Sequence, residues 1–217
     1  MFAAVLFDMD GTIVESDAAV ARAWESWARE YDVPPAELAR VADGVPSDGT
    51  IRMLRPDLDE AALDVAAARQ LELQYDDLHD VHALPGAPEL LAALDTAGIP
   101  WAVVTSADRR LARARLAASG LEVRVLVARD DIVRGKPDPE GYRTAAELLG
   151  AAPADCLVVE DAEAGLAAGR AAGARTAALR GLDGDLRPAD LYELAALLGL
   201  GERVSRSSSR PDRSGAG

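Results

Sequence analysis

Hydrophobic and polar positions along the chain follow two different periods. Between residues 17 and 82, apolar side chains recur every three or four residues, which is the spacing of an amphipathic helix. Two such stripes stand out: Val20, Trp24, Trp27 and Tyr31, and then Leu63, Ala67, Leu71, Tyr75 and Leu78. We expect the two stripes to face each other in a helical hairpin with short helices between, so that both tryptophans are core residues.

From residue 86 onward, short apolar runs alternate with helical patterns. The runs predict strands near 100–105, 123–128, 155–160 and 174–179. The helical patterns cover residues near 87–97, 108–119, 139–149, 163–172 and 190–198. Alternating strands and helices are typical of the α/β class, in which helices cover both faces of a parallel sheet.

The apolar run at the start of the chain supplies one more strand to that sheet. The pattern therefore predicts a discontinuous α/β core domain of residues 1–14 and 86–200, into which a helical domain of residues 15–85 is inserted. Residues 204–217 are rich in Ser, Arg, Gly and Pro, and we expect them to form a disordered tail because they lack apolar content.

Two carboxylates, Asp8 and Asp10, follow the first apolar run directly. Because ligands bind at the carboxyl ends of strands in open α/β sheets, both would lie at the mouth of a site. Asp8 could attack an electrophile as a nucleophile, and Asp10 could act as a general acid or base. Both could also hold a hard cation such as Mg²⁺. An ordinary Asp-Gly turn would explain the same residues without any chemistry.

Polar side chains also follow two later strands. Thr105 and Ser106 lead into a predicted helix, where hydroxyls and unpaired backbone amides form an anion site. Glu160 and Asp161 end the strand near 155–160 and supply further carboxylates for a metal. The strand ends together offer a nucleophile, an acid/base, phosphate donors and metal ligands.

Lys136 is the single lysine of the chain, against 22 arginines, and it stands in the loop segment Gly-Lys-Pro-Asp-Pro. A compact ammonium and a planar guanidinium are not interchangeable beside a small charged centre. Lys136 is therefore a candidate ligand for a phosphoryl group. The alternative interpretation is that Lys136 is an ordinary surface lysine.

With these motifs in this order, the chain resembles the haloacid dehalogenase superfamily of phosphotransferases. The four family motifs match Asp8-Met-Asp-Gly-Thr12, Thr105-Ser106, Lys136 and Glu160-Asp161. The inserted helices resemble the small helical (C1-type) cap of its subfamily IA, in the β-phosphoglucomutase-like and sugar-phosphatase branch. The resemblance implies a Rossmannoid parallel sheet with the strand order 5-4-1-2-3 and the first strand at its centre.

The resemblance also implies a mechanism. Asp8 would attack phosphorus to form an aspartyl-phosphate, and Asp10 would protonate the leaving alcohol and then deprotonate the hydrolytic water. The phosphoryl oxygens would be held by Thr105, Ser106 and Lys136. Mg²⁺ would be held by Asp8, by the backbone carbonyl of Asp10 and by Asp161, with Glu160 behind these ligands.

The residues at a few positions distinguish the different activities of this superfamily. Asp10 is present, which favours phosphoryl chemistry over dehalogenation, and the cap holds no lysine that could form a Schiff base. A mutase needs basic cap residues around the Gly44 loop, where this chain has Asp43 and Ser47. We therefore expect a phosphatase of small phosphate monoesters, such as sugar or polyol phosphates. A phosphomutase is the alternative, and a catalytically silent binding domain is a third.

The composition limits the kinds of partner and the compartment that we expect for this chain. A net charge of −14 argues against nucleic acid and anionic membranes. The single cysteine, Cys156, allows no intramolecular disulfide and suits a reducing compartment. The sequence shows neither a signal peptide nor an apolar run of 18 residues. We expect a cytoplasmic monomer whose partner is a small phosphorylated metabolite, and we assign no role to His79 or His82.

Overall fold

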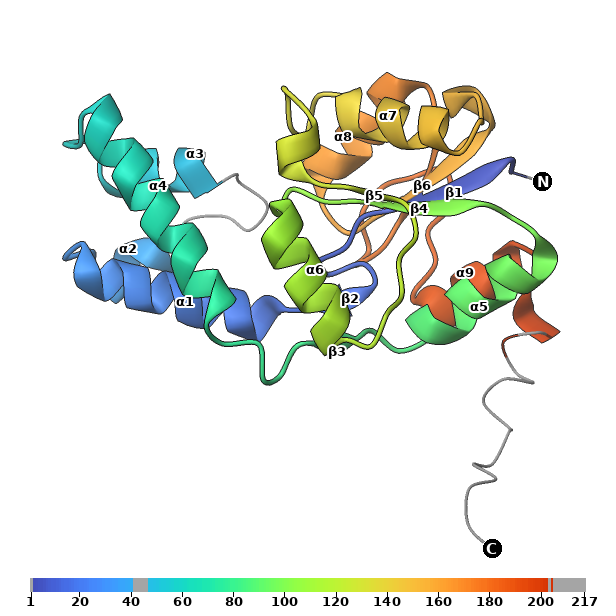
Figure 1. Ribbon diagram of the computed structural model, residues 1–217, viewed down its shortest axis with the longest axis horizontal. Coiled ribbons are helices and arrows are strands. Elements are labelled where there is room, and N and C mark those ends of the chain that lie inside the picture. Colours follow the sequence, from blue (N-terminus) through green and yellow to red (C-terminus); the bar gives the residue numbers. More distant parts are fainter. Residues whose placement is uncertain (1, 41–46, 203, 205–217) are drawn as a thin grey trace, which may run out of the picture.

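A five-stranded parallel sheet forms the centre of the protein in the computed structural model, which describes residues 2–40, 47–202 and 204 (Figure 1). Its strands are β1 (Ala4–Phe7), β4 (Trp101–Val104), β5 (Leu126–Val127), β6 (Cys156–Glu160) and β7 (Arg175–Ala178). They lie side by side in the order β5-β4-β1-β6-β7, and every pair is parallel. Counted within this sheet, the order is 3-2-1-4-5, which is the predicted order viewed from the other edge. The predicted fold class is confirmed.

Alternate side chains of β1 enter two separate cores, as the two-residue period of a strand requires. Ala4 and Leu6 belong to the core beneath α7 (Glu140–Leu148) and α8 (Glu163–Ala172). Val5 and Phe7 belong to the core on the opposite face. The helices of that second face are α5 (Ala87–Ala97), α6 (Arg109–Ala118) and α9 (Leu191–Leu197). Figure 1 shows α7 and α8 above the sheet and α5 and α9 below it.

Four helices form a cap beside this core: α1 (Asp17–Glu30), α2 (Pro35–Leu38), α3 (Ser47–Leu54) and α4 (Glu60–Tyr75). Helices α1 and α4 pack around Trp27, whose indole N–H donates to the carbonyl of Ala66 at 2.9 Å. The buried face of α4 consists of Leu63, Ala66 and Gln70. It therefore differs from the predicted apolar stripe, because it includes a small residue and a polar residue.

The chain enters and leaves the cap through a short antiparallel ladder of β2 (Val14–Glu15) and β3 (His82–Ala83). The amide of Leu84 also donates to the carbonyl of Ile13 at 2.9 Å. Both connections between core and cap thus lie side by side, and the first of them begins four residues after Asp10 along the chain.

Some predicted features fall at the limits of the described residues. Asp43 and Gly44 lie outside them, and Ser47 begins α3. Val204, where the predicted tail starts, is buried against the second core, and residues 205–217 lie outside the described part. Within the described part, no helix combines the length and the apolar character that crossing a membrane requires.

Candidate active site

Three carboxylates meet where β1 and β6 end. Asp8 follows β1, Glu160 is the last residue of β6, and Asp161 comes next. Each of the three offers an oxygen within 4.8 Å of the others. Gly11 turns the loop after β1 with a φ of 78°, and a Cβ at this position would overlap the Asp161 carboxylate. A glycine is therefore required here both for its backbone conformation and for its lack of a side chain.

The ammonium of Lys136 joins two of these carboxylates. It bonds to Asp8 Oδ1, to Glu160 Oε1 at 2.7 Å and to the carbonyl of Val104 at 3.0 Å. Its side chain is 11% exposed. Burial alone would lower the pKa of Lys136, but the charges of Asp8 and Glu160 outweigh burial and raise it. Lys136 therefore stays protonated and points its N–H groups at the end of β1.

Every oxygen of Glu160 has hydrogen-bond partners. Oε1 accepts from Lys136 and, at 2.7 Å, from the hydroxyl of Tyr142 on α7. Oε2 accepts from the backbone amides of the next two residues at 3.2 and 3.3 Å. Gly165 of α8 lies so close that a Cβ there would overlap the carboxylate. These contacts hold the Glu160 carboxylate in place, and the carboxylate in turn holds the ammonium of Lys136.

Negative charge is in excess at this point of the sheet. Burial raises the pKa of Asp8 well above its usual value; Lys136 opposes the shift, and the charges of Glu160 and Asp161 add to it. Burial and the charge of Glu160 also raise the pKa of Asp161 to about 6, against the effect of Arg180. Converging carboxylate oxygens with uncompensated charge fit a hard divalent cation, which is bound by oxygen ligands.

Asp10 lies on the side of this cluster that faces the cap. Its Oδ1 accepts a hydrogen bond from the hydroxyl of Ser16 at 2.7 Å, and its Oδ2 is 2.8 Å from Arg115 Nη1. The structure thus brings Asp8, Lys136 and the carboxylates after β6 together, and it holds Asp10 separately between the core and the first cap helix.

Thr105 and Ser106 follow β4 on the other side of Lys136. Thr105 is buried, and its Oγ1 accepts from the amide of Ala107 at 3.0 Å, while Ser106 is exposed. A hollow of about 10 Å³ is bordered by both residues and by Lys136, and this is roughly the volume of one water molecule. The predicted phosphate donors therefore border one small hollow.

Several contacts of the site were not predicted from the sequence, although Thr12 belongs to the first motif. Thr12 and Arg180 contact Asp161 at 3.3 and 3.1 Å, and Arg180 also reaches Asp17 of α1 at 3.0 Å. Tyr142 and Arg115 stand on helices whose sequences carry no sign of these contacts. Thr12 and Arg180 lie in loops after β1 and β7, so their places after strands could have indicated them, whereas the contacts of Tyr142 and Arg115 depend on how α7 and α6 pack.

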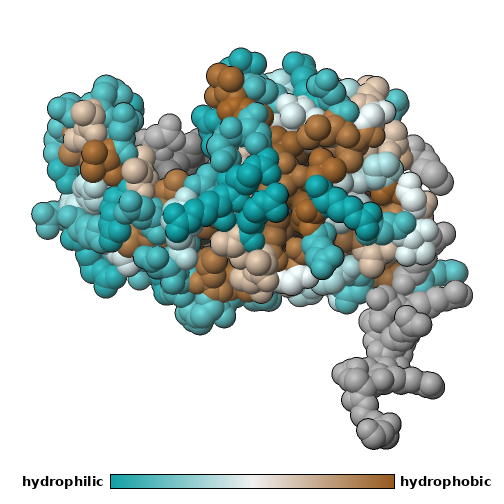
Figure 2. Space-filling view, viewed as in Figure 1, coloured by the Kyte–Doolittle hydropathy of each residue, from teal (hydrophilic) through white to brown (hydrophobic). Residues whose placement is uncertain are grey.

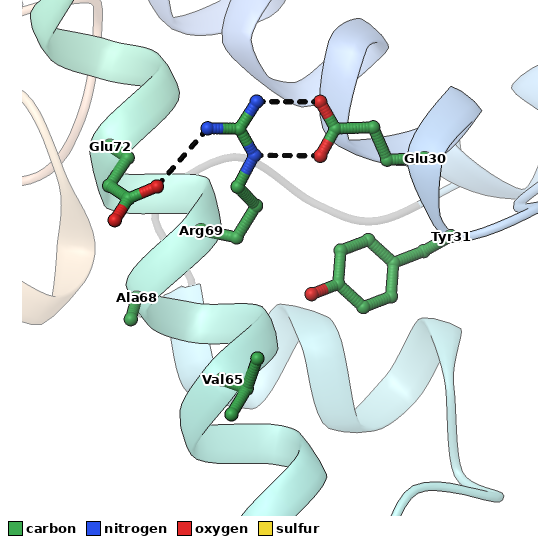
Figure 3. Close-up of a pocket in the computed structure, with 6 residues that line it drawn as sticks. All are labelled: Glu30, Tyr31, Val65, Ala68, Arg69 and Glu72. Atoms are coloured by element: carbon green, nitrogen blue, oxygen red, sulfur yellow. Dashed lines mark hydrogen bonds and ion pairs between the residues drawn. The ribbon is translucent and has the colours of Figure 1, made fainter.

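A larger hollow, of about 450 Å³, lies on the cap between α1 and α4 (Figure 3). Arg69 crosses it with two bonds to Glu30, at 2.7 and 2.8 Å, and one to Glu72 at 3.1 Å. These side chains are partly exposed ion pairs, which contribute little to stability. None of the strand-end residues lines this hollow, so the candidate site is the smaller one in the core.

The chain belongs to the haloacid dehalogenase-like hydrolases, because the model of that family matches residues 2–173. This confirms the resemblance inferred from the four motifs. Over 175 residues, the chain is 42% identical to hexitol phosphatase A of Escherichia coli, covering 80% of this chain and 81% of that protein.

A second relative and a solved structure fall in the same family. The chain is 35% identical over 189 residues to 2-deoxyglucose-6-phosphate phosphatase 1 of Saccharomyces cerevisiae, covering 79% of this chain and 77% of that protein. It is also similar to a haloacid-dehalogenase-family hydrolase of Deinococcus radiodurans, whose crystal structure holds phosphate and sodium. That likeness has a TM-score of 0.62 and 34% identity, and covers 92% of this chain and 88% of the other.

Proposed function

We propose that this protein is a Mg²⁺-dependent phosphatase that hydrolyses small phosphate monoesters of sugars or polyols through an aspartyl-phosphate. The observation that carries the proposal is the ammonium of Lys136, held between Asp8 and Glu160 at the strand ends. Two anions must approach each other when a carboxylate attacks a phosphate, and a fixed ammonium offsets their repulsion. The likeness to hexitol phosphatase A supports the same class of reaction.

The proposed reaction has two steps. In the first, an oxygen of Asp8 forms a bond to phosphorus, the bond from phosphorus to the alcohol oxygen breaks, and that oxygen takes a proton from Asp10. In the second, water gives a proton to Asp10 as its oxygen bonds to phosphorus, and the bond to Asp8 breaks. The products are the alcohol, inorganic phosphate and the original side chains. Thr105, Ser106 and Lys136 would hold the phosphoryl oxygens throughout, since this chemistry rests mainly on positioning and charge.

Asp8, Asp161 and the backbone carbonyl of Asp10 are the groups that we assign to Mg²⁺. The ion supplies positive charge that stabilises the transferring phosphoryl group. Glu160 is not assigned as a ligand because both of its oxygens already accept hydrogen bonds. Its proposed task is to hold Lys136 in place behind the ligands.

Substrate choice is assigned to the cap of residues 15–85, which stands over a catalytic core of residues 1–14 and 86–200. Asp43, Gly44 and Ser47 remain the proposed specificity loop. An acidic or neutral loop is a poor partner for a second phosphate, which disfavours the mutase. The names of the two relatives point to phosphorylated hexitols and hexoses. We also propose that the protein acts in the cytoplasm as a monomer.

Phosphate release from a panel of monoesters tests this function. The panel should include sorbitol 6-phosphate, 2-deoxyglucose 6-phosphate and β-glucose 1-phosphate with a trace of the 1,6-bisphosphate. We expect release of inorganic phosphate from the hexitol or hexose esters. Conversion of β-glucose 1-phosphate to glucose 6-phosphate without free phosphate would support the mutase instead, and no turnover of any ester would contradict the proposal.

Removal of metal should silence the enzyme reversibly. We expect EDTA to abolish phosphate release and added Mg²⁺ to restore it, because three neighbouring carboxylates leave the site too negative to admit a phosphate. Asp161→Ala should weaken Mg²⁺ binding, measured by titration calorimetry, more than Asp10→Asn does, since Asp10 is assigned to the ion through its backbone. Full activity in EDTA, or equal weakening in both variants, would contradict the assignment.

A further inference from the structure

A line of polar side chains leads from Asp10 into the cap. Arg115 of α6 lies in the middle of it, with Nη1 2.8 Å from Asp10 Oδ2 and Nη2 2.8 Å from the side-chain oxygen of Gln74 on α4. Gln74 in turn donates to the side-chain oxygen of Gln70 at 2.7 Å. The guanidinium of Arg115 therefore connects the Asp10 carboxylate to α4, a long helix of the cap.

The burial of Arg115 sets it apart from its neighbours. Its side chain is 3% exposed, whereas Arg110 and Arg113 on the same helix are exposed. Figure 2 shows the resulting hydrophilic surface over α6. Arginine is almost never fully buried unless it is paired. Helix α6 thus turns one arginine inward, at the place where the core meets α4.

A contribution to the stability of the fold does not explain why Arg115 is buried. Among the described residues, Arg115 Nε and Gln70 Nε2 are the buried side-chain atoms without a hydrogen-bond partner. Leaving a buried donor unpaired costs free energy, and a buried ion pair is weak evidence for stability. An apolar side chain of similar length could fill the same space, so the contribution of Arg115 is to be sought in the site.

The geometry at Asp10 indicates what that contribution is. One carboxylate oxygen is held by Ser16 from the start of the cap, and the other is held by Arg115 from the core. Two partners on different elements fix the orientation of the carboxylate. Proton transfer requires the donor and the acceptor to lie within hydrogen-bond reach, and a displacement of about 1 Å costs on the order of 10²-fold in rate.

We propose that Arg115 is a positioning residue that orients Asp10 for proton transfer and, through Gln74, couples this orientation to the position of the cap helix α4. The inference rests on the proposed phosphatase function. It goes beyond that function because it assigns a task to a helix that carries none of the four motifs.

Two substrates with different leaving groups test the inference. The value of kcat/KM depends on the steps up to the departure of the alcohol. A poor leaving group needs a proton from Asp10 in order to depart, whereas a good leaving group does not. For Arg115→Met, we expect kcat/KM on sorbitol 6-phosphate to fall about 10²-fold. On p-nitrophenyl phosphate, kcat/KM should stay within about threefold of wild type while kcat and KM fall together, because the second step still needs Asp10.

Matched variants separate positioning from a merely structural role. Arg113→Met removes the same charge from the exposed side of α6 and should change both values less than about twofold. Combining Arg115→Met with Asp10→Asn should cost no more than Asp10→Asn alone, since residues that act as one unit are not additive. Because Arg115→Met leaves the Asp10 carboxylate and the Gln74 side chain without this partner, its melting temperature should fall, and all assays should run well below it.

Equal losses of kcat/KM on both esters, or independent losses in the double variant, would overturn the inference and leave Arg115 as a link between core and cap. If Arg115→Met does not fold, Gln74→Met answers the same question. It keeps the ion pair and breaks the link to α4, and it should lower kcat/KM on sorbitol 6-phosphate more than on p-nitrophenyl phosphate. A wild type that releases phosphate from neither ester would instead contradict the proposed function.

Discussion

Replacing Asp8 with asparagine should abolish phosphate release while the fold survives. An amide has no charge with which to attack phosphorus, so we expect turnover to fall by at least about 10³-fold. The fold should tolerate the change because burial, helped by the charges of Glu160 and Asp161, already holds the pKa of Asp8 well above its usual value. Removing one of three like charges relieves repulsion, and Lys136 keeps Glu160 and the Val104 carbonyl as partners. The melting temperature should therefore stay level or rise.

Two measurements separate covalent catalysis from a role in binding alone. Acid quenching with a ³²P-labelled ester should leave label on the wild type and none on Asp8→Asn. Beryllium fluoride, which mimics an aspartyl-phosphate, should raise the melting temperature of the wild type only. Asp64→Asn, an exposed aspartate on α4, is the control for loss of one charge and should behave as the wild type. A folded Asp8→Asn variant with near-wild-type phosphate release would contradict the covalent mechanism.

Local patterns predicted those parts of the fold whose causes are local. Helices α5 and α8 have the predicted bounds because Gly98 and Gly173 end them with a left-handed turn. Helix α6 begins at its predicted place because the Asp108 side chain accepts from the amide of Leu111. Strand β5 is shorter than predicted. It lies at the edge of the sheet and pairs with β4 at only two positions.

The residues of the candidate site likewise fall into those that local patterns predicted and those that they did not. Asp8, Glu160 and Asp161 could be predicted because each directly follows or ends an apolar run, and the carboxyl ends of parallel strands meet at one edge of a sheet. Their convergence within 4.8 Å follows from the strand order. Sequence alone gave no sign of Tyr142, since an aromatic residue on the apolar face of a helix is expected to be core.

Contacts between the core and the cap could not be predicted either. Arg115 and Gln74 are 41 residues apart in the chain, and each belongs to a helix whose polar residues would be expected to face solvent. The apolar stripe predicted for α4 likewise missed Gln70, because a hydrophobic pattern cannot register a buried amide. Polar groups buried between two domains become visible only when the packing of those domains is known.

The single lysine should resist replacement by arginine even though the charge is kept. Three acceptors from three different segments converge on one nitrogen of Lys136: Asp8, Glu160 at 2.7 Å and the Val104 carbonyl at 3.0 Å. An ammonium directs three N–H groups from one atom, whereas a guanidinium spreads its donors over a plane. The hollow beside Lys136 measures about 10 Å³ and offers no room for the larger group. Crowding would displace Asp8 or the phosphoryl group.

For Lys136→Arg we expect kcat/KM to fall on the order of 10²-fold, as expected when reacting groups are displaced by about 1 Å. The assay should run well below the melting temperature, so that overpacking, which costs about 1–3 kcal/mol, does not contribute. Arg134→Lys, two residues earlier in the same loop and exposed, is the reverse exchange and should leave activity unchanged. If Lys136→Arg kept more than half of the wild-type kcat/KM, a loss of under ~0.4 kcal/mol in transition-state stabilisation, Lys136 would be shown to act only as a charge.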